Sequence, residues 1–270
     1  MKAAGKKFPY VSAGALFAIA LMCLFSPLFA GGAPRMDFEA ASLPPSASHL
    51  FGTDPLGRDL FAMIFSGGRS SLFIGIFAAA LSAAVAFVYG TAAGLAGETA
   101  DSLMMRLAEL LLAIPPILYV VTIQAAIGSP GAASVAAAIG LTSWMNVAKM
   151  VRTEVLRVRG SEYVLWARHM GGGFFYVMRK HLLPNSAPAV MFMVISSIGG
   201  AIAAEATLSF LGVGLPANVV SWGSLMSLSQ NALLTGDWWV VLIPGAFLVT
   251  TLVCIVNVGE FYRRKNTPDT

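Results

Sequence analysis

Long apolar runs alternate with short polar links along this chain, and the pattern predicts membrane-spanning helices. Each run is close to the roughly 20 apolar residues that an α-helix needs to cross the hydrocarbon core of a bilayer. The predicted spans cover residues 8–30, 72–95, 110–127, 132–151, 189–211 and 238–258. The pattern therefore predicts an all-α polytopic membrane protein with about six transmembrane helices.

Composition supports this class and excludes a soluble one. Of the 270 residues, 57% are hydrophobic and 11% are charged, and the mean hydropathy is +0.77. Soluble domains carry about 25% charged residues. The net charge of +4 does not indicate a nucleic-acid partner, because the cations gather in the polar links and near the chain ends.

The distribution of cations predicts the orientation in the membrane. With six spans, 14 of the 17 Lys and Arg residues fall on the side of the two termini, and only Arg35, Arg58 and Arg69 fall on the other. Cytoplasmic links are enriched in Lys and Arg, so both termini are expected in the cytoplasm. A cleaved signal peptide is the alternative for the first run. However, the run is longer than the apolar region of a signal peptide, which has about 7–15 residues.

The longest polar stretch, residues 152–188, is too long and too patterned for a simple loop. Apolar side chains recur in it at helical spacing, which predicts an amphipathic helix from Tyr163 to Phe174. The residues of this predicted face are Tyr163, Ala167, Met170 and Phe174.

Three consecutive glycines, Gly171–Gly173, are expected to break that helix, because glycine loses the most backbone entropy in a helix and turns readily. A second basic and apolar run, Phe174–Leu183, follows and is predicted to end at Pro184. Helix, turn and helix would then lie across the cytoplasmic mouth of the membrane domain, shaped to enter a groove on a partner.

This stretch resembles a known family. The segment Glu162-Tyr163-Val164-Leu165-Trp166-Ala167-Arg168, with Gly171 and Leu182-Leu183-Pro184-Asn185, is similar to the cytoplasmic EAA loop of ABC importer permeases of the dipeptide, oligopeptide and nickel branch. The resemblance implies the type I permease fold and a coupling helix that docks on an ATPase subunit. It assigns that docking to Glu162, Tyr163, Trp166, Ala167, Arg168, Met170, Gly171 and Pro184.

The match departs from the family at Trp166, where a small alanine is usual, and at Lys180, where arginine is frequent. An indole is much larger than a methyl group, which bears on the fit to a groove. The alternative for the whole stretch is a basic amphipathic loop that rests on lipid headgroups.

A polar segment with a second motif precedes the second predicted span. Within Phe51–Asp59, Asp54 is expected to cap a helix that starts at Pro55, and Arg58 stands four residues on, where it can pair with Asp54. The segment, with Gly68-Arg69-Ser70-Ser71-Leu72 after it, also resembles the same permeases. Two interpretations stay open: a capped surface helix without a ligand, or a substrate or cation site at Asp54 and Asp59.

One ionisable residue, Glu205, lies inside the fifth predicted span. A charge at mid-depth in a bilayer costs at least about 2.5–3.5 kcal/mol, so the side chain should face protein or water. It either lines the translocation path or forms a packing hydrogen bond.

Two further features are expected around the spans. Pro115-Pro116 should kink or interrupt the third span, because each proline removes a backbone donor. Residues 221–237 are too polar to span a bilayer and too few to form a domain, and they are predicted to form a re-entrant or interfacial helix. Its interface anchors would be Trp222, Trp238 and Trp239.

No catalytic or metal-ligating residue is predicted. The sequence lacks G-x-x-x-x-G-K-[ST], and no Ser, His and Asp suggest a triad. Its three histidines form no metal-ligand spacing with Cys or carboxylates. The two cysteines, Cys23 and Cys254, lie in apolar runs and are expected to be free thiols. The chain is therefore not expected to be an enzyme or to bind a cofactor.

The resemblance implies a permease subunit that forms half of a path for peptides, or for nickel or metal chelates. The implied partners are a second permease, two ATPase subunits that carry ATP and Mg, an external binding protein and the lipid of a bacterial or archaeal inner membrane. Residues 1–66 would form the first span and the external segment, 67–265 the permease core with the loop at 152–188, and 266–270 the cytoplasmic tail. An ion-coupled secondary transporter is the alternative, although Glu205 stands alone as an intramembrane charge.

Overall fold

The computed structural model describes residues 8–29, 36–128, 131–216 and 218–266, and all regular structure in this part is helical. Lys2, Lys6, Lys7 and Arg35, which entered the charge count, lie outside it, as does the tail after Asn266. The helices are α1 (Tyr10–Phe29), η1 (Phe38–Ala40), α2 (Leu60–Leu95), α3 (Glu98–Ala113), α4 (Pro116–Ile127), α5 (Ala132–Thr142), α6 (Trp144–Arg159), α7 (Glu162–His169), α8 (Phe174–Val177), η2 (Met178–Leu182), α9 (Leu183–Phe210), α10 (Trp222–Thr235) and α11 (Trp238–Asn266).

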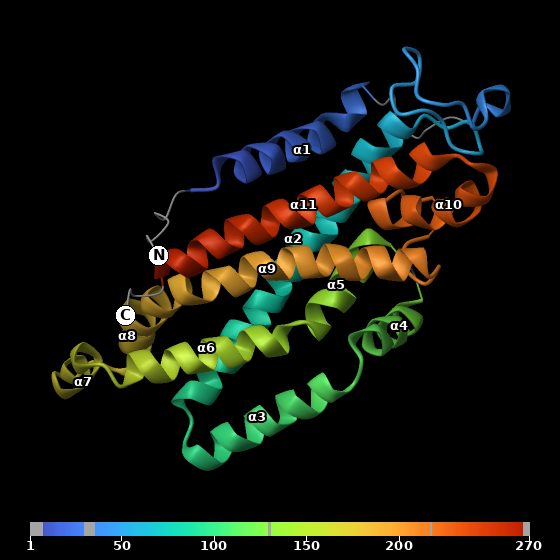
Figure 1. Cartoon of the computed structure of the whole chain (residues 1–270). Coiled ribbons are helices and arrows are strands. Elements are labelled where there is room, and N and C mark those ends of the chain that lie inside the picture. Colours follow the sequence, from blue (N-terminus) through green and yellow to red (C-terminus); the bar gives the residue numbers. More distant parts are fainter. Residues whose placement is uncertain (1–7, 30–35, 129–130, 217, 267–270) are drawn as a thin grey trace, which may run out of the picture.

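Figure 1 shows an elongated bundle in which α2, α9 and α11 run through the body and α1 lies against its upper side. Among the described residues, four helices are long and apolar enough to cross a membrane, and a fifth crossing results if one bent helix pair counts as a single span. The four are Tyr10–Leu28, Leu60–Leu95, Val190–Phe210 and Trp238–Arg264. The predicted all-α polytopic class is confirmed.

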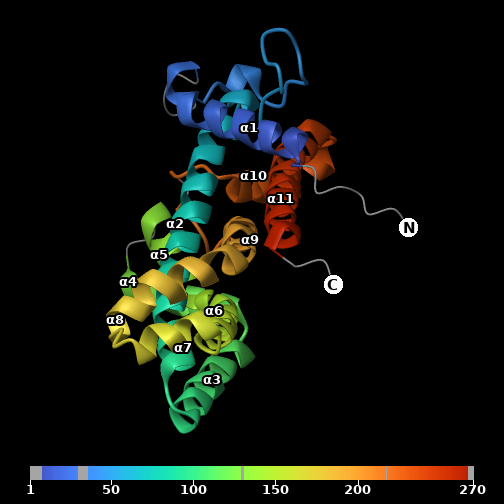
Figure 2. The same cartoon turned by 90° about the vertical axis from the view of Figure 1, so that its left-hand side faces the viewer.

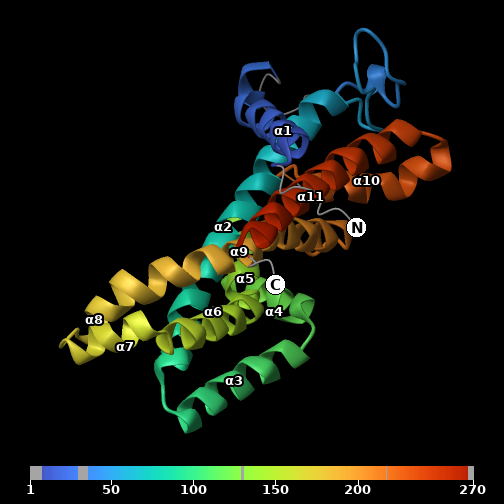
Figure 3. The same ribbon diagram turned by 60° about the vertical axis from the view of Figure 1, so that its left-hand side comes forward.

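The bent pair is α3 with α4, whose axes meet at 86°. The break falls at Ile114 and Pro115, as the proline pair predicts, because neither Pro115 nor Pro116 can donate a backbone hydrogen bond. Figures 2 and 3 show that α3 stands away from the body of the bundle, while α4 returns toward α5.

The fourth predicted span, residues 132–151, is not one helix. It is divided at Ser143 into α5 and α6, and α6 continues to Arg159. At the division, Thr142 Oγ1 donates to the carbonyl of Ala138 at 2.9 Å, and Ser143 Oγ donates to that of Ile139 at 2.7 Å. Such bonds from Ser and Thr to the preceding turn satisfy the hydroxyl inside an apolar bundle and bend helices.

The second span starts earlier than predicted, at Leu60 instead of Leu72, and the expectation of a helix capped by Asp54 is wrong. The cap is Asp59, whose Oδ1 accepts from the backbone N–H of Ala62 at 3.1 Å. The polar and glycine-rich run 66–71 looks like a link in the sequence. It is helical because neighbouring elements pack closely on it and Ser71 finds a buried partner.

Glycines allow α6 to lie close to the inner half of α2. A Cβ on Gly90 would come within 2.5 Å of the carbonyl oxygen of Ala148, and one on Gly94 within 2.7 Å of Val155 Cγ1. The inner core that results joins α2, α6, α7, α8 and α9. Its buried residues are Ala86, Val147, Ala148, Val151, Val155, Val158, Val164, Val177 and Val190.

In the outer half, the short helix α10 begins beside Glu205 of α9. The Glu205 side chain is fully buried, and its Oε1 accepts hydrogen bonds of 2.7 Å each from Ser209 Oγ and Ser221 Oγ. Its Oε2 accepts from Ser71 Oγ of α2 at 3.2 Å. Because Ser221 is the N-cap of α10, one carboxylate joins three helices.

Trp222, the first residue of α10, completes this junction. Its backbone N–H donates to Ser71 Oγ at 3.1 Å, and its indole Nε1 donates to the carbonyl of Ile64 at 2.9 Å. Trp222 and Trp239 are buried, so the prediction that they anchor the protein at the membrane surface is wrong, whereas Trp238 is exposed. The predicted helix is present as the 14 residues of α10, and its re-entrant or interfacial position stays a prediction.

The junction predicts an order of stability for variants at Glu205. Glu205→Leu removes the acceptor of three buried hydroxyls, and each buried group left without its partner costs about 1–3 kcal/mol. Glu205→Gln keeps one carbonyl acceptor and should fall between Leu and the native residue. Thermal unfolding of the purified chain in detergent would test this order, and a Leu variant as stable as the native protein would contradict it.

A second stability prediction uses two glycines that differ in their surroundings. A Cβ on Gly223 would lie 2.4 Å from Ala206 Cα, whereas one on Gly200 meets nothing within 4 Å. Gly223→Ala should lower stability by about 1–3 kcal/mol through overpacking. Gly200→Ala, the matched control, should raise it by about 0.5–1 kcal/mol, as expected for alanine in a helix. Equal melting temperatures for the two variants would disprove the close contact.

Candidate functional site

The loop that the sequence singles out lies at one end of the molecule, where α7 and α8 project beyond the other helices (Figure 1). Two buried valines fix it to the bundle: Val164 of α7 and Val177 of α8 both belong to the inner core. α6 leads into the loop, and Ser161 starts α7 by accepting the backbone N–H groups of Val164 and Leu165, each at 3.1 Å. The loop is thus an anchored element.

The opposite face of α7 is uncovered. The exposed fractions are 46% for Tyr163, 68% for Trp166 and 85% for Met170, while Ala167 is half-buried. Glu162 is exposed as well. The side chains of Arg168 and Phe174 lie outside the described part of the structure. Large apolar side chains that the chain itself leaves in the open mark a surface for a partner.

The glycine turn is confirmed, but the helix before it is shorter than predicted. α7 ends at His169, and Phe174, expected at its end, begins α8. The backbone N–H of Gly172 donates to the carbonyl of Ala167 at 2.9 Å, and Gly171 has φ +84°. That left-handed conformation is the usual way to end a helix at glycine.

The prediction that Pro184 ends the second helix is wrong. The chain passes from α8 through the π-helical turn η2 directly into α9, and Pro184 lies in the first turn of α9. Pro184 cannot donate to the helix ladder, and the π-helical turn η2, whose i→i+5 bonds replace the usual i→i+4 pattern, lies directly before α9. The turn η2 packs against α7: the centroids of the Tyr163 and His181 rings lie 5.9 Å apart.

Ion pairs surround the helix that leads into the loop. Arg152 of α6 donates its Nε to Asp101 Oδ1 of α3 at 2.9 Å, and its Nη2 also bonds Asp101 Oδ2. The hydrogen bonds to Asp101 raise the pKa of the Arg152 guanidinium, with the opposite charge adding to them and partial burial acting against them. Arg157 pairs with Glu154 within α6 at 2.7 Å.

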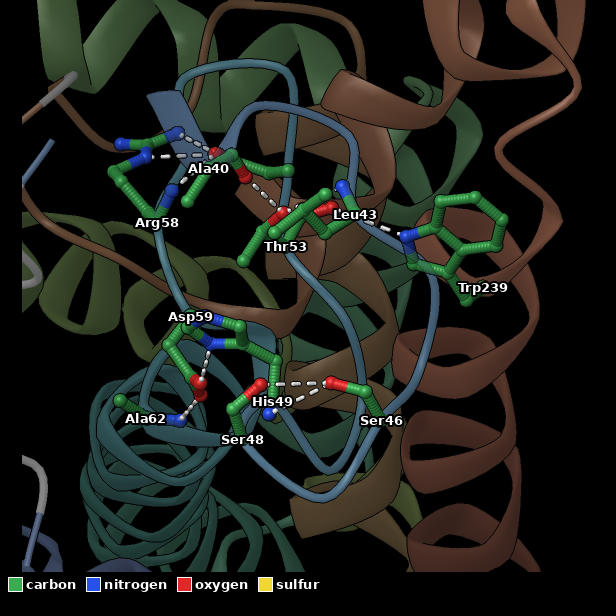
Figure 4. A network of polar contacts seen from close by, with 11 residues as sticks. Ala40, Leu43, Ser46, Ser48, His49, Thr53, Arg58, Asp59, Ala62 and Trp239 are labelled. Atoms are coloured by element: carbon green, nitrogen blue, oxygen red, sulfur yellow. Dashed lines mark hydrogen bonds and ion pairs between the residues drawn. The ribbon is translucent and has the colours of Figure 1, made fainter. Parts of the chain in front are cut away.

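At the end of the molecule opposite α7 (Figure 1), the motif Asp54, Arg58 and Asp59 lies in the folded segment before α2. Figure 4 shows Arg58 and Asp59 in this segment. The Asp54 side chain is fully buried. Its Oδ2 accepts from Arg58 Nη2 at 2.6 Å and Nε at 2.8 Å. Its Oδ1 accepts the backbone N–H groups of Leu56 and Arg58 at 2.9 and 2.8 Å. The predicted Asp54–Arg58 pair is confirmed, although it closes a turn and not a helix.

These contacts occupy both oxygens of Asp54, and those of Asp59 are engaged too. Asp59 Oδ2 lies 2.8 Å from His49 Nδ1, and its Oδ1 caps α2. The arrangement favours the structural interpretation of the motif over a ligand site. Within the described residues, no group of three or more His, Cys, Asp or Glu is placed to hold a metal ion.

Sequence reasoning missed the residues that brace this segment. Thr53 donates its hydroxyl to the carbonyl of Ala40, and its own carbonyl accepts from Trp239 Nε1 at 3.1 Å. Ser42 Oγ donates to Asp237 Oδ2 at 2.8 Å. Partners separated by almost 200 residues in sequence leave no local signal. Ser71, which is 134 residues from Glu205, leaves no local signal either, and Ser221, 16 residues away, lies beyond the spacing of neighbours on one helix. Their contacts favour packing for Glu205.

A cavity of about 160 Å³ lies between α4, α5 and α9. Its three hydroxyl-bearing residues, Thr142, Ser143 and Thr207, donate to carbonyls of their own helices. The wall is otherwise apolar. It is formed by Pro116, Ile117, Val120, Ile139, Thr142, Ser143, Ala204, Thr207 and Leu208.

Comparison with known proteins agrees with this arrangement. The family model of the binding-protein-dependent transport system inner membrane component matches residues 86–265. In solved structures, an amino acid ABC transporter crystallised with histidines shares the fold, with a TM-score of 0.54 and 13% identity over 75% of this chain and 94% of that one.

Curated relatives are more similar in sequence. A dipeptide transport system permease of Bacillus subtilis is 38% identical over 84% of this chain and 70% of its own length. An oligopeptide transport system permease of the same organism is 35% identical over 91% and 80%. A probable D,D-dipeptide permease of Escherichia coli is 32% identical over 96% and 87%. With its helical bundle, projecting loop and these matches, the chain belongs to the family of inner membrane permease components of binding-protein-dependent transport systems.

Proposed function

We propose that this chain is a permease subunit of an ATP-driven ABC importer and forms half of the translocation path for peptides. The observation that carries the proposal is the projecting α7 loop, which is fixed in the inner core by Val164 and Val177 and leaves Tyr163, Trp166 and Met170 uncovered. An anchored element with an exposed apolar face is suited to transmit force between two proteins.

The partner at this face is proposed to be an ATPase subunit. Transport against a gradient needs an energy source, and no nucleotide-binding motif occurs in this sequence. ATP and Mg would bind to two such subunits, and hydrolysis would occur there. A second related permease would complete the path. The family is described by its dependence on a binding protein, which would deliver substrate at the external end.

Peptides are the proposed substrate because the relatives described above are dipeptide, oligopeptide and D,D-dipeptide permeases. Nickel has no comparable support. The secondary-transporter alternative is disfavoured, because Glu205, the carboxylate in the fifth predicted span, is fully buried and bonded to three serine hydroxyls. A role for Glu205 in lining the path stays a prediction.

The proposed orientation places the α7 loop and both termini in the cytoplasm of a bacterial or archaeal cell. The start of α1 and the end of α11 lie together, with the rings of Phe8 and Phe261 5.1 Å apart. Consider a reporter that is active only on the external side of the membrane. Fused after Thr270 it should be inactive, whereas inserted at Ser46 in the external segment it should be active. Activity of the fusion after Thr270 would contradict the topology.

The docking proposal predicts the effect of a charge at Ala167. If this half-buried residue lies at closest approach to the ATPase subunit, Ala167→Glu buries an unpaired charge, which costs about 3–5 kcal/mol. Binding should then fall by more than about a hundredfold. The measurement is the amount of ATPase subunit that co-purifies with the permease. Full retention together with normal transport would reject the docking role of α7.

Two glycines of the same turn provide a matched pair. Gly171 has φ +84°, which a β-branched residue avoids, whereas Gly173 has no positive φ and open space around its Cβ position. Gly171→Val should strain the turn by about 1–3 kcal/mol and reduce ATPase retention. Gly173→Val, the control, should retain the ATPase subunits at the native level. The turn has no special role if both variants behave alike.

A further inference from the structure

The helix α3 stands apart from the bundle and is tied to it by a few polar side-chain contacts. Two of them come from α6: the Arg152–Asp101 pair and the pair of Lys149 Nζ with Glu109 Oε1 at 3.1 Å. A third comes from α2, where the Tyr89 hydroxyl donates to the carbonyl of Met104 at 2.8 Å. Of the α3 residues, Ala108 alone is buried among those described, so packing alone does not fix this helix.

The two ion pairs are unequal. Arg152 and Asp101 are 31% and 13% exposed and bond through two donor atoms, whereas Lys149 and Glu109 are 36% and 61% exposed and meet at one. Two parallel bonds fix the direction as well as the distance of a guanidinium and a carboxylate. Exposed ion pairs that meet through a single contact contribute little to stability. The Arg152–Asp101 pair is therefore the contact that sets the position of α3 against α6.

The Arg152–Asp101 pair joins two helices that lead to different parts of the molecule. α6 continues through Gly160 and Ser161 into α7, the proposed docking helix. α3 continues through the proline-marked 86° bend into α4, and Pro116, Ile117 and Val120 of α4 form one wall of the 160 Å³ cavity. The loop and the cavity wall are thus joined by two helices, α6 and α3, and by the ion pairs between them, of which Arg152–Asp101 is the bidentate one.

We propose that Asp101 and Arg152 are a positioning pair that carries displacement of the α7 loop to the α4 wall of the cavity. The inference rests on the proposed function, in which the ATPase subunits move the loop. When α6 shifts with the loop, the bidentate pair pulls α3 along, and α3 turns α4 about the proline bend. Without the pair, α6 moves and α4 does not follow.

A charge exchange tests this pair in the complete complex with its ATPase subunits and binding protein, reconstituted in proteoliposomes with radiolabelled dialanine. Arg152→Asp and Asp101→Arg each place like charges together, and the double variant restores an opposite pair. We expect each single variant to lose about tenfold in uptake per ATP hydrolysed, with the ATPase subunits still bound. The double variant should recover most of the loss.

Arg264→Asp provides the control for a reversed cytoplasmic charge. Arg264 is exposed on α11 and pairs with Glu260 of the same helix at 2.9 Å, so its reversal should leave the ratio of uptake to hydrolysis at the native value. A loss as large as that of Arg152→Asp would assign the effect to net charge and overturn the proposal.

A second measurement reports on the cavity itself. A cysteine introduced as Thr207→Cys lies on the cavity wall, and the rate at which maleimide labels it should change when ATP is added to the otherwise native complex. This change should vanish with Arg152→Asp and return with the exchanged pair. Single variants that keep both the labelling change and the native ratio would overturn the inference, whereas a native complex without ATP-driven uptake would instead reject the proposed function.

Discussion

Close contact between α2 and its neighbours is the constraint on which the rest of the structure depends. Glycines recur along this helix, and a Cβ at Gly68, Gly75 or Gly90 would come within about 2.5 Å of an atom of α1, α9 or α6. In a membrane, lipid is as apolar as the side chains, so helices associate through close packing and not through exclusion of water. α2 can therefore serve as the shared surface for helices from both ends of the sequence.

Close packing also determines where polar groups are tolerated. Without water in the bilayer core, a carboxylate needs donors from the protein, and Glu205 obtains three from serines on α2, on α9 and at the start of α10. Those hydroxyls reach it because Gly67, Gly68 and Gly223 bring the backbones together. The buried carboxyl group and the small residues thus depend on each other, and together they fix the start of α10, although its 14 residues are too few to cross a membrane.

The sequence predicts features that local physics determines, and it fails where distant partners decide. Apolar run length predicts the first, fifth and sixth spans, Pro115-Pro116 predicts the break between α3 and α4, and the glycine triplet predicts the turn after α7. Asp54 was assigned a capping role because its local context suits one, but the carboxylate of Asp59 takes that role while Arg58 and two backbone N–H groups saturate Asp54. Likewise, Ser143 breaks an apolar run that shows no interruption in composition.

The two ends of the molecule differ in whether their side chains have partners within the chain. In the segment before α2, the side chains of Asp54 and Thr53 both have partners within the chain, and Trp239 of α11 donates to the carbonyl of Thr53. At the α7 end, Trp166 and Met170 remain mostly uncovered although Val164 beside them is fully buried. Since uncovered aromatic and Met side chains are typical of protein interfaces, this face of α7 supports the docking role proposed for it. The ion pair of Arg152 with Asp101 lies on α6, the helix that leads into α7, and joins α6 to α3.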